Sequence, residues 1–202
     1  MIHLYKNDLP TGLDLGESVA IDTETLGLNV FRDRLCLVQI SSGDGHAHLI
    51  RIGDPDDAYN LKKLLKDDTV QKIFHFARFD LAILSHTFGI HIRNVYCTKI
   101  ASKIARTYTD RHGLKNLCKD MLGIDLSKDE QSSYWNADKL SEKQINYAAS
   151  DVWYLHQLRD RLNEILIREG RLELAERCFS ALQDTIVSLD LANMSEEYIF
   201  SH

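Results

Sequence analysis

The order of apolar segments in this sequence predicts a mixed α/β domain. Three strand-like segments follow one another early in the chain, and helical and strand-like segments then alternate before a long helical part. The strict βαβ alternation and the GxGxxG fingerprint of a dinucleotide-binding fold are both missing. With 202 residues, of which 44% are hydrophobic, the chain can form a full core. We expect one domain over residues 1–202, with a mixed five-stranded sheet flanked by helices.

The five strands are expected where β-branched and apolar runs are bounded by turn residues. In chain order they cover residues 19–25, 34–43, 46–53, 70–76 and 95–98. A Ser-Gly-Asp-Gly turn at 42–45 joins the second strand to the third, so the first three form a meander.

Helical periodicity accounts for most of the remaining chain. Helices are expected over residues 56–68, 78–89, 99–108, 113–123, 140–170 and 171–200. Gly89 is placed to end the second of these, and Ser141 with Gln144 forms a capping box at the start of the fifth. The apolar stripe of the last helix, about residues 170–200, predicts packing on its own domain or a subunit interface.

Composition excludes several classes of protein. A net charge of −6 argues against non-specific coating of duplex nucleic acid, although it leaves room for a local basic groove or a small nucleotide ligand. The apolar runs are too short to span a membrane, and the first ten residues lack the pattern of a signal peptide. The four cysteines are widely spaced, with no CxxC pair. We expect a cytoplasmic protein with reduced thiols and no membrane association.

Two carboxylates stand near the end of the first expected strand, in "VAIDTETLGL". Asp22 and Glu24 are two residues apart, so their side chains share a face of the strand. Two buried carboxylates this close should raise each other's pKa, which makes the pair costly without a partner.

Two more acidic residues occupy helices. Asp80 follows a strand and opens a helix, where an acid can simply favour the helix dipole. Asp151 shares the inward face of a later helix with Tyr147, four residues before it, and a buried Tyr–Asp hydrogen bond would explain that pair. Taken together, however, four converging carboxylates favour a site for divalent ions, which bind oxygen ligands and stabilise phosphoryl displacement.

Three ordered motifs extend this interpretation. "IDTET", "FARFD" and "YAASD" resemble the D-x-E, (F/Y)-D and Y-x-x-x-D motifs of the DEDD family of 3′→5′ exonucleases. The rest of the chain, including "RDRLCLVQIS", is similar to the RNase D branch, and within it to the nano-RNase C group of oligoribonucleases. Position 146 is Asn, where the other branch of the family has His, which places the chain in the tyrosine subclass. The resemblance implies a ribonuclease-H-like fold and two bound divalent ions, Mg²⁺ or Mn²⁺.

The resemblance also implies a role for each motif residue. Asp22 would bridge both ions, Glu24 and Asp151 would hold the ion that carries the attacking water, and Asp80 would help to hold the second ion. Tyr147 would orient or deprotonate the water. Because a free tyrosine has a pKa near about 10, orientation is the safer assignment.

Substrate contacts are expected around these acids. Leu28 would wedge between the last two bases, although a core leucine at a strand end is the alternative. His75 and Phe76 stand where the family often has Asn, and a core histidine is equally consistent with the first of them. The full expected set is Thr23, Leu26, Leu28, His75, Phe76, Arg106 and His112. Cations available for phosphate are Arg78, Lys99, Lys103, Arg106, Arg111, His112 and Lys115.

The expected function is metal-dependent 3′→5′ degradation of very short RNA, especially dinucleotides, to mononucleotides. A broader exonuclease acting on longer RNA or single-stranded DNA is one alternative, and a non-catalytic nucleic-acid-binding module is another. The nano-RNase C group implies a homo-oligomer, an octamer by that resemblance. A zinc site at His46 and His48 is disfavoured, because the sequence offers no clear third ligand.

Overall fold

The computed structural model describes residues 1–127 and 133–201, so residues 128–132 and 202 of the expected domain lie outside the described part. The strands are β1 (Ile2–Lys6), β2 (Ser18–Thr25), β3 (Leu35–Ser41), β4 (Ala47–Arg51), β5 (Gln71–Phe74) and β6 (Val95–Cys97). In the described residues they form one six-stranded sheet of order β1-β4-β3-β2-β5-β6. β3 pairs antiparallel with β2 and β4, and the remaining pairs are parallel. The predicted mixed sheet is confirmed.

The count of five strands was one too low. β1 is the additional strand, and it pairs with β4 only, at the edge of the sheet. Its sequence IHLYK alternates apolar and polar residues, but it is short and its burial is incomplete. A short edge strand carries a weak sequence signal because a single neighbour stabilises it.

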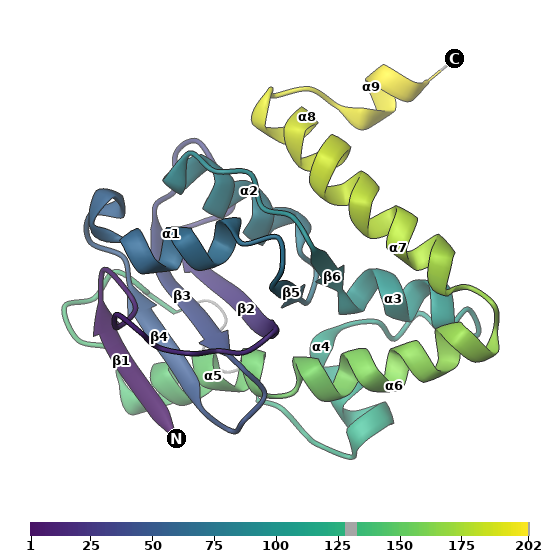
Figure 1. Ribbon diagram of the computed structural model, residues 1–202, viewed down its shortest axis with the longest axis horizontal. Coiled ribbons are helices and arrows are strands. Elements are labelled where there is room, and N and C mark those ends of the chain that lie inside the picture. The colour runs from purple at the N-terminus through teal and green to yellow at the C-terminus, as the bar shows by residue number, and fades with distance from the viewer. Residues whose placement is uncertain (128–132, 202) are drawn as a thin grey trace.

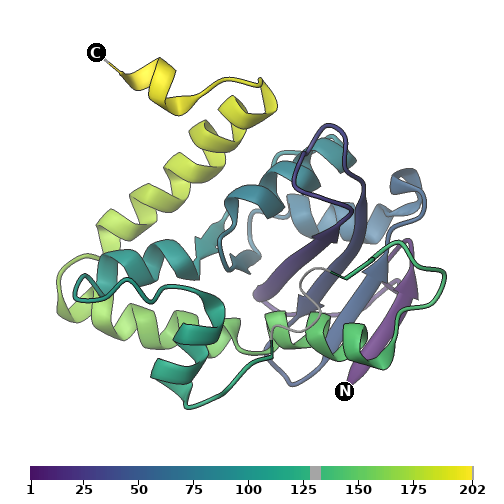
Figure 2. The ribbon, with the colours of Figure 1, turned by 180° about the vertical axis from the view of Figure 1, so that it is seen from behind.

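The helices cover both faces of the sheet. A 3₁₀ turn, η1 (Pro55–Asp57), precedes α1 (Tyr59–Lys66), and α2 (Arg78–Phe88) lies with α1 on one face (Figure 1). α5 (Glu142–Trp153) lies on the other face, across β2, β3 and β4 (Figure 2). The capping box at Ser141 and Gln144 is present, and Gly89 ends α2 in the left-handed conformation with a φ of 63°.

The long helix expected over 140–170 is broken. Tyr154 separates α5 from α6 (Leu155–Arg168), with a φ of −109° that departs from helical geometry. The break lets α5 follow the sheet while α6 packs against α3 (Thr98–Ala105). The helix expected over 113–123 is likewise α4 (Leu114–Leu117) followed by a π-helical turn, η2 (Cys118–Leu122).

The C-terminal region is a series of short helices and not one continuous helix. It contains α7 (Leu172–Ala181), a π-helical turn η3 (Leu182–Ile186), α8 (Val187–Leu191) and α9 (Glu196–Phe200). These extend away from the sheet toward the C-terminus (Figure 1). Arg78 at the start of α2 pairs with Asp190 at 2.8 Å and Glu196 at 3.1 Å, which joins this region to the helices packed on the sheet. No helix in the described residues is both long and apolar enough to cross a bilayer.

Candidate active site

A pocket of about 830 Å³ opens at the carboxyl end of β2. Its walls come from β2 and the loop after it, the β5–α2 connection, and the starts of α3 and α4, with α5 closing one side. All five predicted catalytic residues line it: Asp22, Glu24, Asp80, Tyr147 and Asp151. Segments separated by more than a hundred residues in sequence therefore meet at one place.

Three of the carboxylates form a tight group. Asp22, Glu24 and Asp151 each offer an oxygen, and these oxygens all lie within 4.8 Å of one another. The two-residue period of β2 aims the first two at the same face, and α5 brings the third from across the sheet. Asp80, on α2, accepts a hydrogen bond of 2.5 Å from the hydroxyl of Thr23, the residue that stands between the two β2 acids in the sequence.

The metal-free cluster strongly disfavours ionisation. Burial raises the pKa of Asp22 to about 7. Burial, and then the charges of Asp22, Asp151 and Asp80, raise the pKa of Glu24 to about 10. The pKa values of Asp80 and Asp151 also lie well above the usual range, first because of burial and then because of Asp22.

No lysine or arginine compensates these acids, since no ion pair in the described part of the chain includes any of them. Hard divalent cations prefer carboxylate oxygens and remove the repulsion between them. The donor set of Asp22, Glu24 and Asp151 therefore fits a divalent ion, and Asp80 lines the same pocket.

Tyr147 lies one helical turn before Asp151 and donates a hydrogen bond to its carboxylate. Burial, and then the charges of Asp151, Glu24 and Asp22, raise the pKa of the Tyr147 phenol far above its ordinary value. The phenol is therefore a proton donor at neutral pH. Its ring packs at 6.1 Å, centroid to centroid, against Trp135, which also lines the pocket.

Two leucines follow β2 along the pocket rim. Leu26 and Leu28 both line the pocket, and the side chain of Leu28 is 85% exposed. That exposure rules out the alternative in which Leu28 belongs to the core. An exposed leucine beside a polar pocket has no stabilising role within the chain, so its apolar surface is available to a ligand.

His75 and Phe76 also line the pocket. Phe76 has a φ of 64°, unusual for a bulky residue, and its exposed ring lies 3.6 Å from the Lys99 ammonium group. The Thr98 hydroxyl donates to the carbonyl of Phe74 and lies 2.9 Å from His75 Nδ1. Nδ1 is then the donor, which leaves Nε2 as an acceptor. Burial, and then the charge of Lys99, lower the pKa of His75 to about 3, so the ring is neutral.

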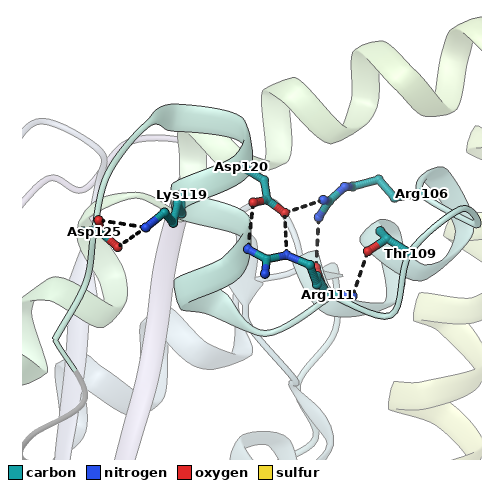
Figure 3. A network of polar contacts seen from close by, with 6 residues as sticks. All are labelled: Arg106, Thr109, Arg111, Lys119, Asp120 and Asp125. Carbon is teal, nitrogen blue, oxygen red and sulfur yellow. Dashed lines mark hydrogen bonds and ion pairs between the residues drawn. The ribbon is translucent and has the colours of Figure 1, made fainter.

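Most of the candidate cations lie outside the pocket. Arg106 is 4% exposed and pairs with Asp120 at 2.8 Å, and Arg111 pairs with the same carboxylate at 3.0 Å (Figure 3). Nδ1 of His112 lies 2.8 Å from the Ser102 hydroxyl. Neither Arg106 nor His112 lines the pocket, whereas Lys99 and Lys115 do.

Trp135 is among the pocket residues that were absent from the sequence prediction. Trp135 is buried, and its indole N–H has no hydrogen-bond partner. The sequence signal that could have identified Trp135 as a site residue was a tryptophan within the polar stretch "YWNAD". By contrast, the disfavoured zinc site does have a third histidine nearby, because His3 lies 2.9 Å from His46, nitrogen to nitrogen. Within the described residues, however, only Asp22, Glu24 and Asp151 meet the geometry of a metal-binding group.

Comparison with known proteins gives consistent matches. Residues 7–167 match a family model described as 3′-5′ exonuclease. A ribonuclease D from Gluconacetobacter diazotrophicus is 36% identical over 166 residues, which are 82% of this chain and 42% of that relative. This chain thus spans less than half of the length of that protein.

Two solved structures match almost end to end. Brucella melitensis NrnC with bound Mg²⁺ is 53% identical, with a TM-score of 0.93 over 100% of this chain and 98% of that one. The same Brucella protein bound to pGG is 55% identical, with a TM-score of 0.94 and the same coverage.

Proposed function

This chain belongs to the family of 3′→5′ exonucleases and has its ribonuclease-H-like fold, and from that premise we propose that it is a metal-dependent exoribonuclease for very short RNA, especially dinucleotides. The observation that carries the proposal is the convergence of four carboxylates, one buried and three half-buried, without a compensating cation among the described residues, in a pocket with exposed apolar residues on its rim. The products would be 5′-mononucleotides.

The proposed metal ligands are Asp22, Glu24, Asp80 and Asp151. Two divalent ions, Mg²⁺ or Mn²⁺, would supply positive charge at the scissile phosphate and acidify the attacking water. Asp22 groups with Glu24 and Asp151, and its charge also acts on Asp80, which supports its role as a ligand shared by two ions. Mg²⁺ in the similar Brucella protein supports the choice of a divalent ion.

Tyr147 would orient the attacking water. Its phenol keeps its proton because its pKa is raised, so it can donate a hydrogen bond but is a poor general base before metal binds. The hydrogen bond to Asp151 and the packing against Trp135 hold the phenol in one position. Positioning of this kind reduces the entropic cost of bringing the nucleophile to the phosphate.

The rim residues would bind the terminal nucleotides. Leu28 would separate the last two bases and Phe76 would offer a stacking surface, with Lys99 and Lys115 near the phosphates. The volume of the pocket, about 830 Å³, is in the range of sites for small ligands. The similar Brucella protein has been solved bound to pGG, which supports a substrate of this size.

The similarity to ribonuclease D favours one second candidate, an exonuclease that trims longer RNA or single-stranded DNA. The test is a time course with 5′-labelled RNAs of increasing length from a dinucleotide, in Mg²⁺ and in Mn²⁺, beside an Asp22→Asn control. Fast cleavage of the dinucleotide with much slower attack on long RNA supports the proposal. Equal rates at all lengths favour the second candidate, and no cleavage by the wild type contradicts both.

We extend the proposal to assembly and location. Exposed apolar side chains, including Leu174, Tyr198 and Phe200, cluster in the C-terminal helices, which supports a homo-oligomer and, by family resemblance, an octamer. Light scattering at micromolar concentration tests this, and a monomer would contradict it. The four cysteines are free, consistent with a cytoplasmic enzyme.

A further inference from the structure

Gln39 is a buried amide without a partner at the centre of the sheet. It belongs to β3, its side chain is 0% exposed, and neither Nε2 nor Oε1 has a hydrogen-bond partner. Leaving a buried polar group unpaired destabilises the folded state, and such groups are rare in folded proteins. An apolar residue of the same size would avoid this cost, so the amide requires an explanation.

The register of the sheet places this amide beside the candidate metal site. Gln39 is directly opposite Asp22 in the antiparallel β2–β3 pair, and its partner on β4 is Leu49. Residues directly opposite in such a pair point to the same face, with Cβ atoms about 5 Å apart. β2 and β3 lie side by side near the centre of the sheet (Figure 1).

The other side chains that the register places around Gln39 are apolar or already hydrogen-bonded, as Ser41 is, except for Glu24, which lies diagonally across the strand pair. Leu49 lies on one side of Gln39, and Leu37 is two residues along the same face of β3; both belong to a small apolar cluster that includes Trp135 and Ala148. The Asp22 carboxylate is thus the polar side chain directly across the strand pair. A glutamine side chain is long enough to reach it.

We propose that Gln39 is a positioning residue: its amide, unpaired in this structure, would donate a hydrogen bond to Asp22 in the metal-bound protein and hold this carboxylate in its metal-binding orientation. The inference rests on the proposed metal site. Residues that hydrogen-bond a metal ligand fix its orientation, and their loss typically lowers metal affinity about 10–100-fold.

An uncharged donor suits this position. A lysine or arginine at residue 39 would form an ion pair with Asp22 and compete with the divalent ions for its charge. An amide orients the carboxylate and leaves its negative charge available. The energetic cost of the unpaired amide is then offset when the Asp22 carboxylate accepts its hydrogen bond.

The test replaces Gln39 with an apolar residue of similar size and measures Mg²⁺ binding by calorimetry. For Gln39→Met we expect the Kd for Mg²⁺ to rise at least about tenfold, while the Tm in EDTA stays equal to that of the wild type or rises. Gln39→Leu repeats the measurement should the first variant fold poorly. The Mg²⁺ concentration that gives half-maximal cleavage should rise in parallel.

Val38→Ala is the matched control, because Val38 is buried on the same strand and faces the opposite side of the sheet. It should lower the Tm in EDTA and leave the Kd for Mg²⁺ unchanged. A Gln39→Met protein that loses stability but binds Mg²⁺ like the wild type would overturn the inference about Gln39 and leave the proposed metal site standing. A wild type that binds no Mg²⁺ would overturn the proposed metal site as well.

Discussion

Replacing Asp22 by Asn should abolish activity and yet stabilise the metal-free protein at alkaline pH. Burial raises the pKa of Asp22 from its ordinary value of 3.8 to about 7. Since a tenfold change in an acid constant is worth about 1.4 kcal/mol, ionising Asp22 in the folded chain costs at most about 4 kcal/mol relative to the unfolded chain. Solvent screening in an open pocket reduces the figure, and we expect a gain of roughly 2–4 kcal/mol for Asp22→Asn at pH 8.

The sign of the pH dependence follows from the direction of this change in pKa. A carboxyl whose pKa is raised by folding contributes stability below its unfolded value of 3.8, and that stability is lost as the pH rises through about 7. The metal-free wild type should therefore lose stability between about pH 4 and pH 8. The Asp22→Asn protein should lose less stability over this pH range. Glu24 should also ionise more readily in this variant, because the Asp22 charge contributes to the raised pKa of Glu24.

Thermal unfolding followed by circular dichroism measures the effect. In EDTA at pH 8 the Asp22→Asn protein should melt roughly 5–15 °C above the wild type, from about 2–4 °C per kcal/mol for a chain of this size. Added Mg²⁺ should raise the Tm of the wild type and leave the variant nearly unchanged. Asp110→Asn, which alters an exposed acid, is the control and should behave like the wild type. A variant that melts below the wild type in EDTA at pH 8 would refute the electrostatic reasoning.

Three further substitutions separate the roles of the remaining residues. Leu28→Ala should raise the KM for a dinucleotide without changing the Tm, because the side chain is exposed, and unchanged kinetics would exclude the wedge. Tyr147→Phe should lower kcat about 100-fold with little change in Mg²⁺ affinity by calorimetry; a normal kcat would remove the phenol from the reaction. Arg106→Met should lower the Tm by breaking the ion pair with Asp120 while leaving the KM for a dinucleotide unchanged, and a raised KM would return Arg106 to the substrate site.

The local part of the site could be predicted from sequence. The two-residue period of a strand aligns Asp22 with Glu24, and the helical period aligns Tyr147 with Asp151, so each pair follows from spacing alone. Spacing could not establish that the two pairs meet Asp80 at one site; the family resemblance predicted it. The structure brings them into one pocket.

Contacts between distant segments were the part that sequence could not supply. Nothing in the run "RTYTDRHGLK" indicates that Arg106 is buried against Asp120, because a basic residue in a loop has the same signal whether it is paired or free. Gln39 is an equivalent case, since its importance depends on the β2–β3 register that places it opposite Asp22. The edge strand β1 was missed because only its pairing with β4 gives it structure.

The distribution of charge explains how an acidic chain can bind an anionic substrate. Arg78, Arg106 and Arg111 are all neutralised by carboxylates outside the pocket, which leaves Lys99 and Lys115 as the lysines that line it. Lys99 is held against the Phe76 ring on the rim, and no ion pair in the described residues joins it to the acids proposed to bind metal. A cation inside the acidic cluster would neutralise it and weaken divalent binding. Separating the two kinds of charge would let the acids bind metal while the rim attracts phosphate, so the net charge of −6 does not oppose the proposed function.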